Sequence, residues 1–180
     1  MTELPSLRET VDSHGLMAKK ALGQNFLLDH NITDKIIRSS LAARGTEDFS
    51  QEDVFEIGPG PGGLTRAVLK ANPHSLTVVE MDERCIEIMR ELQAVYGEKL
   101  NIVNGDAMKF DFGQQSAQRK SVVSNLPYNI SVPLLIVFLK QMRQFNSLTL
   151  MFQKEVAERI LAEPPAEIGR AVQQECRDRS

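Results

Sequence analysis

Residues 54–63 read VFEIGPGPGG, and this stretch decides the fold class. Its first four residues read as a buried strand, and a helix is expected to begin near Leu64. Between the two, Gly58, Gly60 and Gly63 fit the pattern G-x-G-x-x-G, in which the backbone can turn tightly and approach a ligand without intervening Cβ atoms. A plain strand-to-helix turn is the alternative, but such a turn rarely needs four glycines. The stretch therefore indicates a ligand-binding turn in an α/β domain.

Strand-like and helix-like segments alternate from residue 30 onward, which is typical of an α/β domain. The expected strands are residues 54–57, 76–80, 100–103, 122–125 and 148–152. The first expected helices are residues 31–43, after a possible cap at Asn31, and a helix that begins at Leu64. An amphipathic helix is expected to follow, with Ile86, Met89, Leu92 and Val95 on one face. The last two are residues 133–142 and residues 154–162, with Val156 and Ile160 facing inward. This alternation predicts a mostly parallel sheet with right-handed crossovers.

Ligands of such sheets bind at the carboxyl ends of the strands. Four of the expected strand ends carry residues suited to a ligand, namely Gly58, Glu80, Asp106 and Asn125. Glu80 can accept hydrogen bonds from both hydroxyls of a ribose, and Asp106 can accept one from an adenine amine. A solvated strand-end charge and a turn-forming aspartate are the respective alternatives. Together the residues favour an adenosine-containing ligand.

Two such ligands compete, a dinucleotide and S-adenosylmethionine (SAM). Pro59 and Pro61 stiffen the glycine-rich turn and remove backbone donors where a pyrophosphate would need them. SAM has no phosphate, so the prolines do not count against it.

The run Asn125-Leu126-Pro127-Tyr128 follows an apolar strand and offers an amide, a backbone carbonyl, a rigid turn and an aromatic face. This set can bind a planar base that carries an exocyclic amine, through hydrogen bonds at its edge and stacking on its face. The alternative is an ordinary turn at the end of a strand, because Asn and Pro often mark turns.

Composition indicates one soluble globular domain, with 180 residues of which 42% are hydrophobic and 25% charged. A net charge of −3 does not indicate a nucleic-acid binder, although it leaves room for a local basic face. Two distant cysteines and three scattered histidines predict no metal site and a reducing cytoplasm. No membrane span, secretory signal or transit peptide is indicated, and residues 1–16 are expected to be a flexible N-terminal extension.

Five motifs occur in the order of a known family: Leu22 to Leu27, Glu56 to Thr65, Gly105-Asp106-Ala107, Asn125 to Ser131, and Phe152 to Ala157. With them the chain resembles the ribosomal RNA small-subunit adenine dimethyltransferases, the KsgA family, over residues 17–163. Related enzymes that act on large-subunit rRNA share the architecture. The resemblance implies a Rossmann-like SAM-dependent methyltransferase that dimethylates N6 of two adjacent adenosines near the 3′ end of small-subunit rRNA, in ribosome biogenesis.

The resemblance also implies roles for individual residues. The cofactor SAM would lie against Asn25, Leu27, Gly58, Gly60, Glu80, Asp106 and Asn125. The catalytic set would be Asn125, Leu126, Pro127 and Tyr128. The Asn125 side-chain oxygen and the Leu126 carbonyl would accept hydrogen bonds from the adenine amine, Pro127 would fix the turn, and Tyr128 would stack on the base. No metal or strong general base is needed, since catalysis would rest on alignment and electrostatics.

The resemblance ends near residue 163, and residues 164–180 form a divergent tail. The family continues with two further strands and a helical C-terminal domain, so we expect a truncated or frame-shifted, incomplete methyltransferase domain; a genuine short variant is the alternative.

The full-length protein is expected to be monomeric. The short sheet is expected to expose an apolar edge that invites aggregation or edge pairing. SAM binding is expected to be weak at best, and methyl transfer is expected to be absent or much reduced. A non-catalytic ribosome- or RNA-binding remnant and a dinucleotide oxidoreductase are the competing functions.

Overall fold

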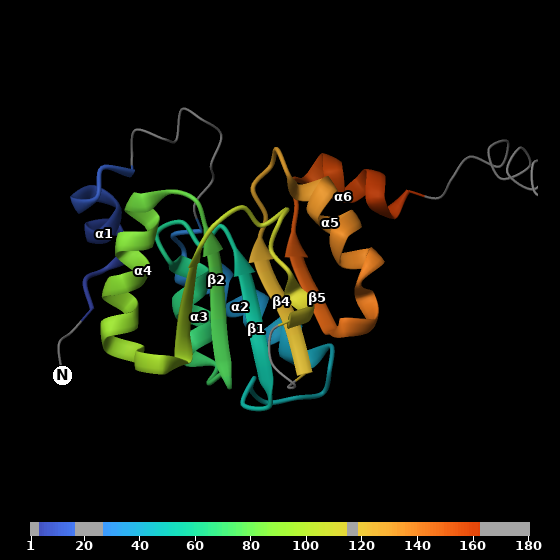
Figure 1. Ribbon diagram of the computed structural model, residues 1–180, viewed down its shortest axis with the longest axis horizontal. Coiled ribbons are helices and arrows are strands. Elements are labelled where there is room, and N and C mark those ends of the chain that lie inside the picture. The colour runs from blue at the N-terminus through green and yellow to red at the C-terminus, as the bar shows by residue number, and fades with distance from the viewer. Residues whose placement is uncertain (1–3, 17–26, 115–118, 163–180) are drawn as a thin grey trace, which may run out of the picture.

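The structure is a computed structural model that describes residues 4–16, 27–114 and 119–162. These residues contain a five-stranded sheet with the order β3-β2-β1-β4-β5, in which all four neighbouring pairs are parallel (Figure 1). The strands are β1 (Glu52–Ile57), β2 (Ser75–Glu80), β3 (Leu100–Asn104), β4 (Arg119–Asn125) and β5 (Phe145–Met151). The predicted α/β class and the predicted parallel sheet are confirmed.

Helices cover both faces of the sheet, as Figure 1 shows. They are α1 (Leu7–Ser13), α2 (His30–Ala42), α3 (Gly63–Lys70), α4 (Glu83–Tyr96), α5 (Ser131–Lys140) and α6 (Lys154–Leu161). Successive residues of a strand point to opposite faces. In β1, Val54 accordingly packs with α2, α3 and α4, whereas Phe55 and Ile57 pack with α5.

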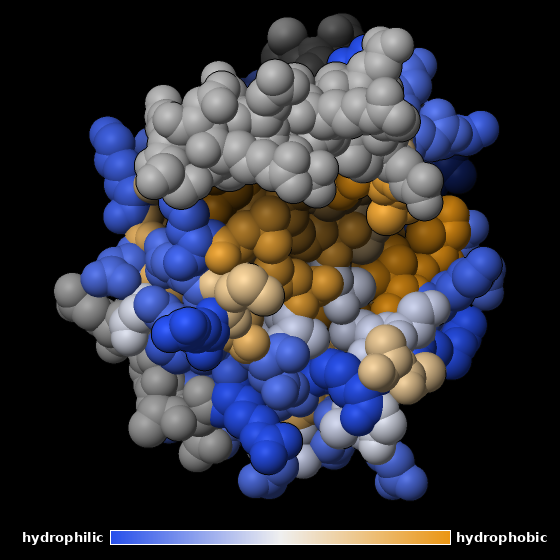
Figure 2. All heavy atoms as spheres, turned by 90° about the vertical axis from the view of Figure 1, so that its right-hand side faces the viewer, coloured by the Kyte–Doolittle hydropathy of each residue, from blue (hydrophilic) through white to orange (hydrophobic). Residues whose placement is uncertain are grey.

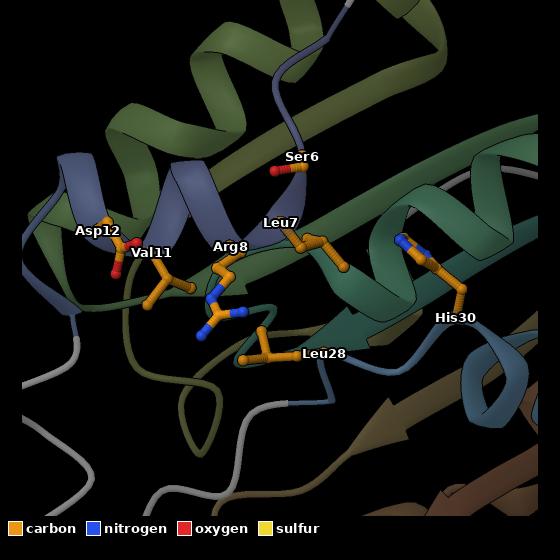
Figure 3. Close-up of a pocket in the computed structure, with 7 residues that line it drawn as sticks. All are labelled: Ser6, Leu7, Arg8, Val11, Asp12, Leu28 and His30. Carbon is orange, nitrogen blue, oxygen red and sulfur yellow. The ribbon is translucent and has the colours of Figure 1, made fainter.

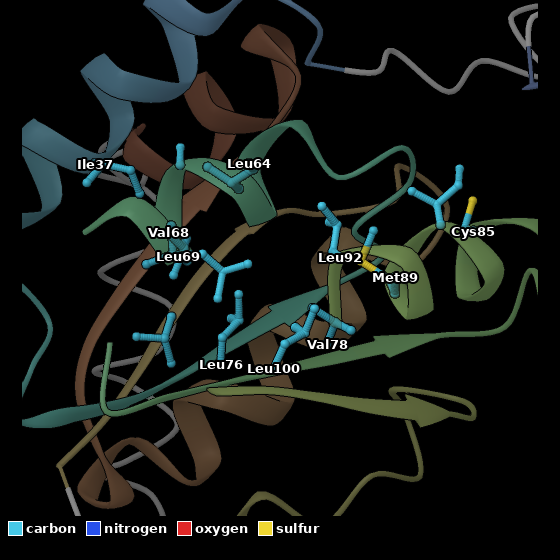
Figure 4. Packing of buried hydrophobic residues seen from close by; sticks show 14 of the residues in the cluster. Ile37, Leu64, Val68, Leu69, Leu76, Val78, Cys85, Met89, Leu92 and Leu100 are labelled. Carbon is cyan, nitrogen blue, oxygen red and sulfur yellow. The ribbon is translucent and has the colours of Figure 1, made fainter. Parts of the chain in front are cut away.

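The larger apolar cluster lies between the sheet and the first four helices (Figure 4). Strand residues Leu76, Val78 and Leu100 pack there against helix residues such as Val68 and Met89, and all of these side chains are buried. The smaller cluster is rich in phenylalanine, and Phe112 makes edge-on ring contacts with Phe55, Phe138 and Phe145 at centroid distances of 5.6, 5.3 and 5.8 Å. The two clusters fix the strands whose ends carry the candidate site.

Several predicted bounds shift by a few residues. β1 begins at Glu52, before the predicted strand, because the buried Glu52 carboxylate bonds with Arg44 and Ser121. β5 spans Phe145–Met151 rather than 148–152, and α5 spans Ser131–Lys140 rather than 133–142. The cap of α2 is Asp29, whose side chain accepts a hydrogen bond from the Asn31 backbone.

The N-terminal residues 4–16 are not the flexible extension that the sequence predicts. Ser6 and Glu9 form a reciprocal capping box that begins α1. Leu7, Val11 and Leu16 are buried, and the last two belong to the larger apolar cluster. The polar composition of this segment obscures an apolar stripe that packs on α3 and α4.

Two side chains predicted to face the core are exposed instead. Val95 is 48% exposed in the last turn of α4, beyond the buried residues of that helix. Ile160 is 44% exposed on α6, in which no residue is buried and Val156 is half-buried. Amphipathic spacing in these two places predicts the helix correctly, but not the depth of its packing.

Strand β5 forms one edge of the sheet within the described residues. Figure 2 shows an extensive apolar surface on the side of the molecule that carries β5, α5 and α6. Exposed apolar residues of this side are Val132, Ile136, Leu139, Met142, Ile160 and Leu161. β5 itself contains no charged residue that would discourage pairing with another strand.

Candidate cofactor and base site

The predicted site residues of β1 to β4 lie along one edge of the sheet. Gly58 directly follows β1, Glu80 ends β2, Asp106 lies two residues after β3, and Asn125 ends β4. Hydrogen bonds link neighbouring strand ends, from the Gly58 amide to the Val79 carbonyl (2.9 Å) and from the Gly105 amide to the Glu80 carbonyl (2.9 Å). The structure therefore brings these four positions together at the carboxyl edge, where parallel sheets bind ligands.

The turn after β1 requires glycine at several positions. Gly58, Gly60 and Gly62 have φ values of +64°, +55° and +85°, in the left-handed region that residues with a Cβ rarely adopt. A Cβ on Gly58 would also lie 3.1 Å from Pro127 Cγ. The glycine-rich turn and the Asn125–Tyr128 run are thus in direct contact, although 67 residues separate Gly58 from Asn125 in the sequence.

Leu27 lies against the first residue of α3. A Cβ on Gly63 would fall 2.0 Å from the Leu27 carbonyl oxygen, so only glycine permits this approach. This contact places Leu27 beside the glycine-rich turn, as a cofactor-lining residue would be. Asn25, the other predicted residue of this segment, lies outside the described residues.

The Glu80 carboxylate is held in a fixed orientation at the end of β2. Its Oε1 accepts hydrogen bonds from the backbone amides of Met81 (2.7 Å) and Asp82 (2.9 Å). Its Oε2 accepts no hydrogen bond from the described residues. A carboxylate oxygen oriented in this way can accept hydrogen bonds from the hydroxyls of a ribose.

Asp106 begins a tight turn. Its Oδ1 accepts a hydrogen bond from the Met108 amide (2.9 Å), and its backbone carbonyl accepts one from the Lys109 amide (2.9 Å). The turn-forming alternative for this aspartate is therefore correct. It remains compatible with binding an amine, because Oδ2 accepts no hydrogen bond from the described residues.

A serine that the sequence analysis overlooked separates the ends of β1 and β4. The paired register of these strands runs from Glu52 and Arg119 to Phe55 and Val122. Beyond it, the Ser124 hydroxyl donates to the Ile57 carbonyl (2.8 Å) and accepts from the Ile57 amide (3.2 Å). The strand order reverses between β1 and β4, which is where sheets of this kind open a ligand crevice.

The run after β4 is a compact turn. The Ile130 amide donates to the Pro127 carbonyl (3.1 Å), and the Ser131 hydroxyl donates to the Tyr128 carbonyl (3.2 Å). The Leu126 side chain is buried in the phenylalanine-rich cluster, whereas Asn125, Pro127 and Tyr128 are half-buried. The buried leucine anchors the backbone whose carbonyl is the candidate acceptor.

A buried acid lies beneath the glycine-rich turn, and the sequence analysis assigned it no role. Glu56 is 2% exposed, and its Oε2 accepts a 2.7 Å hydrogen bond from Thr65 Oγ1 in the first turn of α3. Burial raises the pKa of Glu56 to about 8; the Thr65 hydrogen bond lowers it in part, and the nearby Glu80 charge raises it further. A charged residue inside an apolar strand was the available signal. Glu56 and Thr65 together tie the two ends of the turn to each other.

Metal ligands and membrane spans are not found in the parts of the chain that the structure describes. Within residues 4–16, 27–114 and 119–162, no three His, Cys, Asp or Glu side chains gather as a metal site would require. No described helix has the length and apolar character needed to cross a membrane.

Comparison with known proteins identifies the family. Residues 15–171 match the family model of the ribosomal RNA adenine dimethylases. "Ribosomal RNA small subunit methyltransferase A" of Chelativorans sp. (strain BNC1) is 49% identical over 169 residues, and the protein of the same name from Jannaschia sp. (strain CCS1) is 46% identical over 164 residues. The alignments cover 91% and 89% of this chain, but 59% and 55% of the relatives. The chain thus spans somewhat more than half the length of the curated relatives that it matches.

Solved structures agree with this assignment. A dimethyladenosine transferase from Plasmodium falciparum is 32% identical, with a TM-score of 0.62 over 75% of this chain and 46% of that protein. The 23S rRNA methyltransferase ErmE, at 24% identity and a TM-score of 0.61 over 74% of this chain and 50% of that protein, shares the fold. Fold and sequence similarity agree, and the chain belongs to the ribosomal RNA adenine dimethylase family.

Proposed function

We propose that the chain is a SAM-dependent adenine-N6 dimethyltransferase whose substrate is small-subunit rRNA, at two adjacent adenosines near its 3′ end. The observation that carries the proposal is the contact between Gly58 and Pro127, because it joins a cofactor turn to a base-binding turn at one sheet edge. The names of the curated relatives support the rRNA substrate. The setting would be ribosome biogenesis in the cytoplasm.

The residues present fit SAM as the cofactor. Gly58 and Gly60 remove side chains from the approach to the strand end, and Oε2 of Glu80 and Oδ2 of Asp106 accept no hydrogen bond from the described residues. Pro59 and Pro61 lack the backbone N–H groups that would bind a pyrophosphate, which disfavours a dinucleotide. Leu27 would border the methionine end, and Asn25 would complete this set. When bound, SAM supplies an electrophilic methyl group attached to its sulfonium sulfur. The neutral thioether that remains after methyl transfer is a good leaving group.

The base side of the site would be formed by the turn after β4. The N6 amine of adenine is a poor nucleophile, because its lone pair is delocalised into the ring. The Asn125 side-chain oxygen and the Leu126 carbonyl would accept hydrogen bonds from this amine and favour a pyramidal nitrogen with a localised lone pair. Pro127 would fix the carbonyl direction, and Tyr128 would stack on the ring. Alignment and electrostatics would supply the rate enhancement.

Calorimetry and a methylation assay test the proposal. SAM should bind and NAD should not, and Asn125→Ala should reduce methylation of undermethylated small subunits about 100-fold, as expected when a transition-state hydrogen bond is removed. Asn101→Ala, an exposed asparagine on β3, is the matched control and should leave the rate unchanged. Unchanged methylation by Asn125→Ala would exclude the catalytic role. SAM binding without any methyl transfer would match the competing function, an RNA-binding protein without turnover, and equally the incomplete domain expected from the sequence.

We also propose that the purified chain associates through the side that carries β5. Its edge strand has no charged residue, and Ile136 and Leu139 of α5 are exposed. Figure 2 shows an apolar surface on this side of the molecule. A strand edge that pairs with no other described strand, beside an apolar surface, is a template for pairing with a second copy.

A further inference from the structure

Helix α1 lies before the residues that match the family model, which begin at residue 15, yet it is firmly attached to the domain. Arg66 of α3 donates to the Pro5 carbonyl (2.6 Å) and to Thr10 Oγ1 (3.3 Å). On α4, Arg84 donates to the Gly15 carbonyl (3.4 Å). α1 and the residues that flank it therefore contact both helices that start at the cofactor edge, one after the glycine-rich turn and the other after Glu80.

A cavity of about 420 Å³ lies between α1 and the start of α2 (Figure 3). Its lining residues are Ser6, Leu7, Arg8, Val11, Asp12, Leu28 and His30. Leu7 also approaches the cofactor turn, because a Cβ on Gly63 would lie 3.4 Å from Leu7 Cδ1. The cavity thus shares a wall with the turn after β1, and its volume falls in the range of small-ligand sites.

The cavity combines an apolar floor with polar groups that have no partner in the described residues. Leu7 and Val11 are buried, and Figure 3 shows Arg8 and Val11 reaching from α1 toward Leu28. The side chains of Arg8, Asp12 and His30 are exposed and make no hydrogen bond or ion pair with any described residue. They offer a guanidinium, a carboxylate and an imidazole to a ligand.

We propose that this cavity binds one unstacked base of the RNA substrate, near the adenosine that is methylated. The inference rests on the proposed function. The Arg8 guanidinium can stack on the face of a base, the carboxylate of Asp12 can accept a hydrogen bond from a ring amine, and the leucine and valine side chains can cover the opposite face. The opposite charges of Arg8 and Asp12 offset each other, so the cavity suits a neutral base better than a phosphate.

Binding of a fluorescent RNA tests the proposal. The probe is the 3′-terminal stem-loop of small-subunit rRNA with unmethylated adenosines, titrated with the full chain and followed by anisotropy. Arg8→Ala should weaken binding about tenfold, since base stacking on a side chain is lost, and Asp12→Ala should weaken it less. Arg38→Ala, which removes an exposed arginine of α2 outside the cavity, is the control for charge alone and should leave affinity within about twofold of wild type.

The outcomes separate the base from other ligands. A tenfold effect of Arg8→Ala that persists at high salt supports a stacked base, whereas an effect that vanishes with salt indicates a phosphate contact and overturns the proposal. Titration with AMP alone distinguishes a free nucleotide: AMP binding that Arg8→Ala abolishes would overturn the assignment to RNA. Equal RNA affinities of wild type, Arg8→Ala and Arg38→Ala would also overturn it.

SAM calorimetry on the same variants distinguishes this inference from the proposed function. SAM should bind wild type and Arg8→Ala equally, because Arg8 is not among the cofactor residues. If SAM binds but Arg8→Ala leaves RNA affinity unchanged, only the cavity assignment fails. If wild type binds neither SAM nor RNA, the proposed function fails and the cavity assignment fails with it.

Discussion

Gly58 lies against the ring of Pro127, so that a Cβ on the glycine would be 3.1 Å from Pro127 Cγ and 3.5 Å from Pro127 Cδ. The 3.1 Å distance is shorter than most real Cβ contacts. The two residues belong to the turns that follow β1 and β4, so the contact links the ends of these strands. A side chain added at Gly58 would therefore crowd the turn that follows β4.

Gly58→Ala should accordingly destabilise the protein and lower SAM affinity. The left-handed φ of +64° costs a residue with a Cβ about 1–2 kcal/mol, and the crowding with Pro127 adds about 1 kcal/mol more. Gly45→Ala is the matched control, because Gly45 has the same φ of +64° but nothing within 4 Å of the Cβ position. Denaturant unfolding and calorimetry check both effects. Equal losses of stability in the two variants would show that the Pro127 contact contributes nothing.

Much of this arrangement could be predicted from the sequence, because it depends on local pattern. The glycine spacing, the apolar strands and the polar residues at the strand ends are all read within short windows, and the structure places Gly58, Glu80, Asp106 and Asn125 on one edge. The Gly58–Pro127 contact could not be read in this way. It joins distant segments, and only the strand order brings β1 beside β4.

The features that the sequence analysis overlooked also depend on contacts between different elements of the fold. Ser124 resembles any polar residue near a strand end until its hydroxyl is seen to bond both backbone groups of Ile57. The buried Glu56 is stabilised by Thr65, a partner in the following helix. Helix α1 was obscured by its charged residues, because the apolar stripe of Leu7, Val11 and Leu16 is meaningful only against α3 and α4.

Gly63→Ala should prevent the native approach of the segment before α2. A Cβ there would lie 2.0 Å from the Leu27 carbonyl oxygen, so the Leu27 backbone or the start of α3 would have to shift. We expect a loss of about 3 kcal/mol or more in unfolding free energy. Gly105→Ala, whose Cβ would meet only Val103 Cγ1 at 3.8 Å, should lose much less. Chemical denaturation that finds both variants equally stable would contradict the contact.

Self-association through the β5 side should respond to charge on α5. Sedimentation of the purified chain should show concentration-dependent association, and the double variant Ile136→Lys with Leu139→Lys should shift it toward monomer, because desolvating two lysines opposes burial of that surface. Val95→Lys changes an equally exposed apolar residue at the end of α4 and should leave association unchanged. A purely monomeric wild-type chain at high concentration would refute edge pairing.

The stability of the protein should fall as pH rises toward about 8, because of Glu56. Burial raises the pKa of this carboxyl from its ordinary value of 4.5 to about 8, so the folded state retains a proton that the unfolded state releases. The contribution of Glu56 is therefore fully present below about pH 4.5 and is lost as pH rises through the folded pKa, with a slope of at most about 1.4 kcal/mol per pH unit.

Glu56→Gln stays neutral and can still accept a hydrogen bond from Thr65. The difference in unfolding free energy between wild type and Glu56→Gln should therefore grow with pH across this range, whereas Glu98→Gln, at an exposed site, should show a constant difference. Parallel pH profiles for wild type and Glu56→Gln would show that Glu56 is ionised in the folded protein throughout.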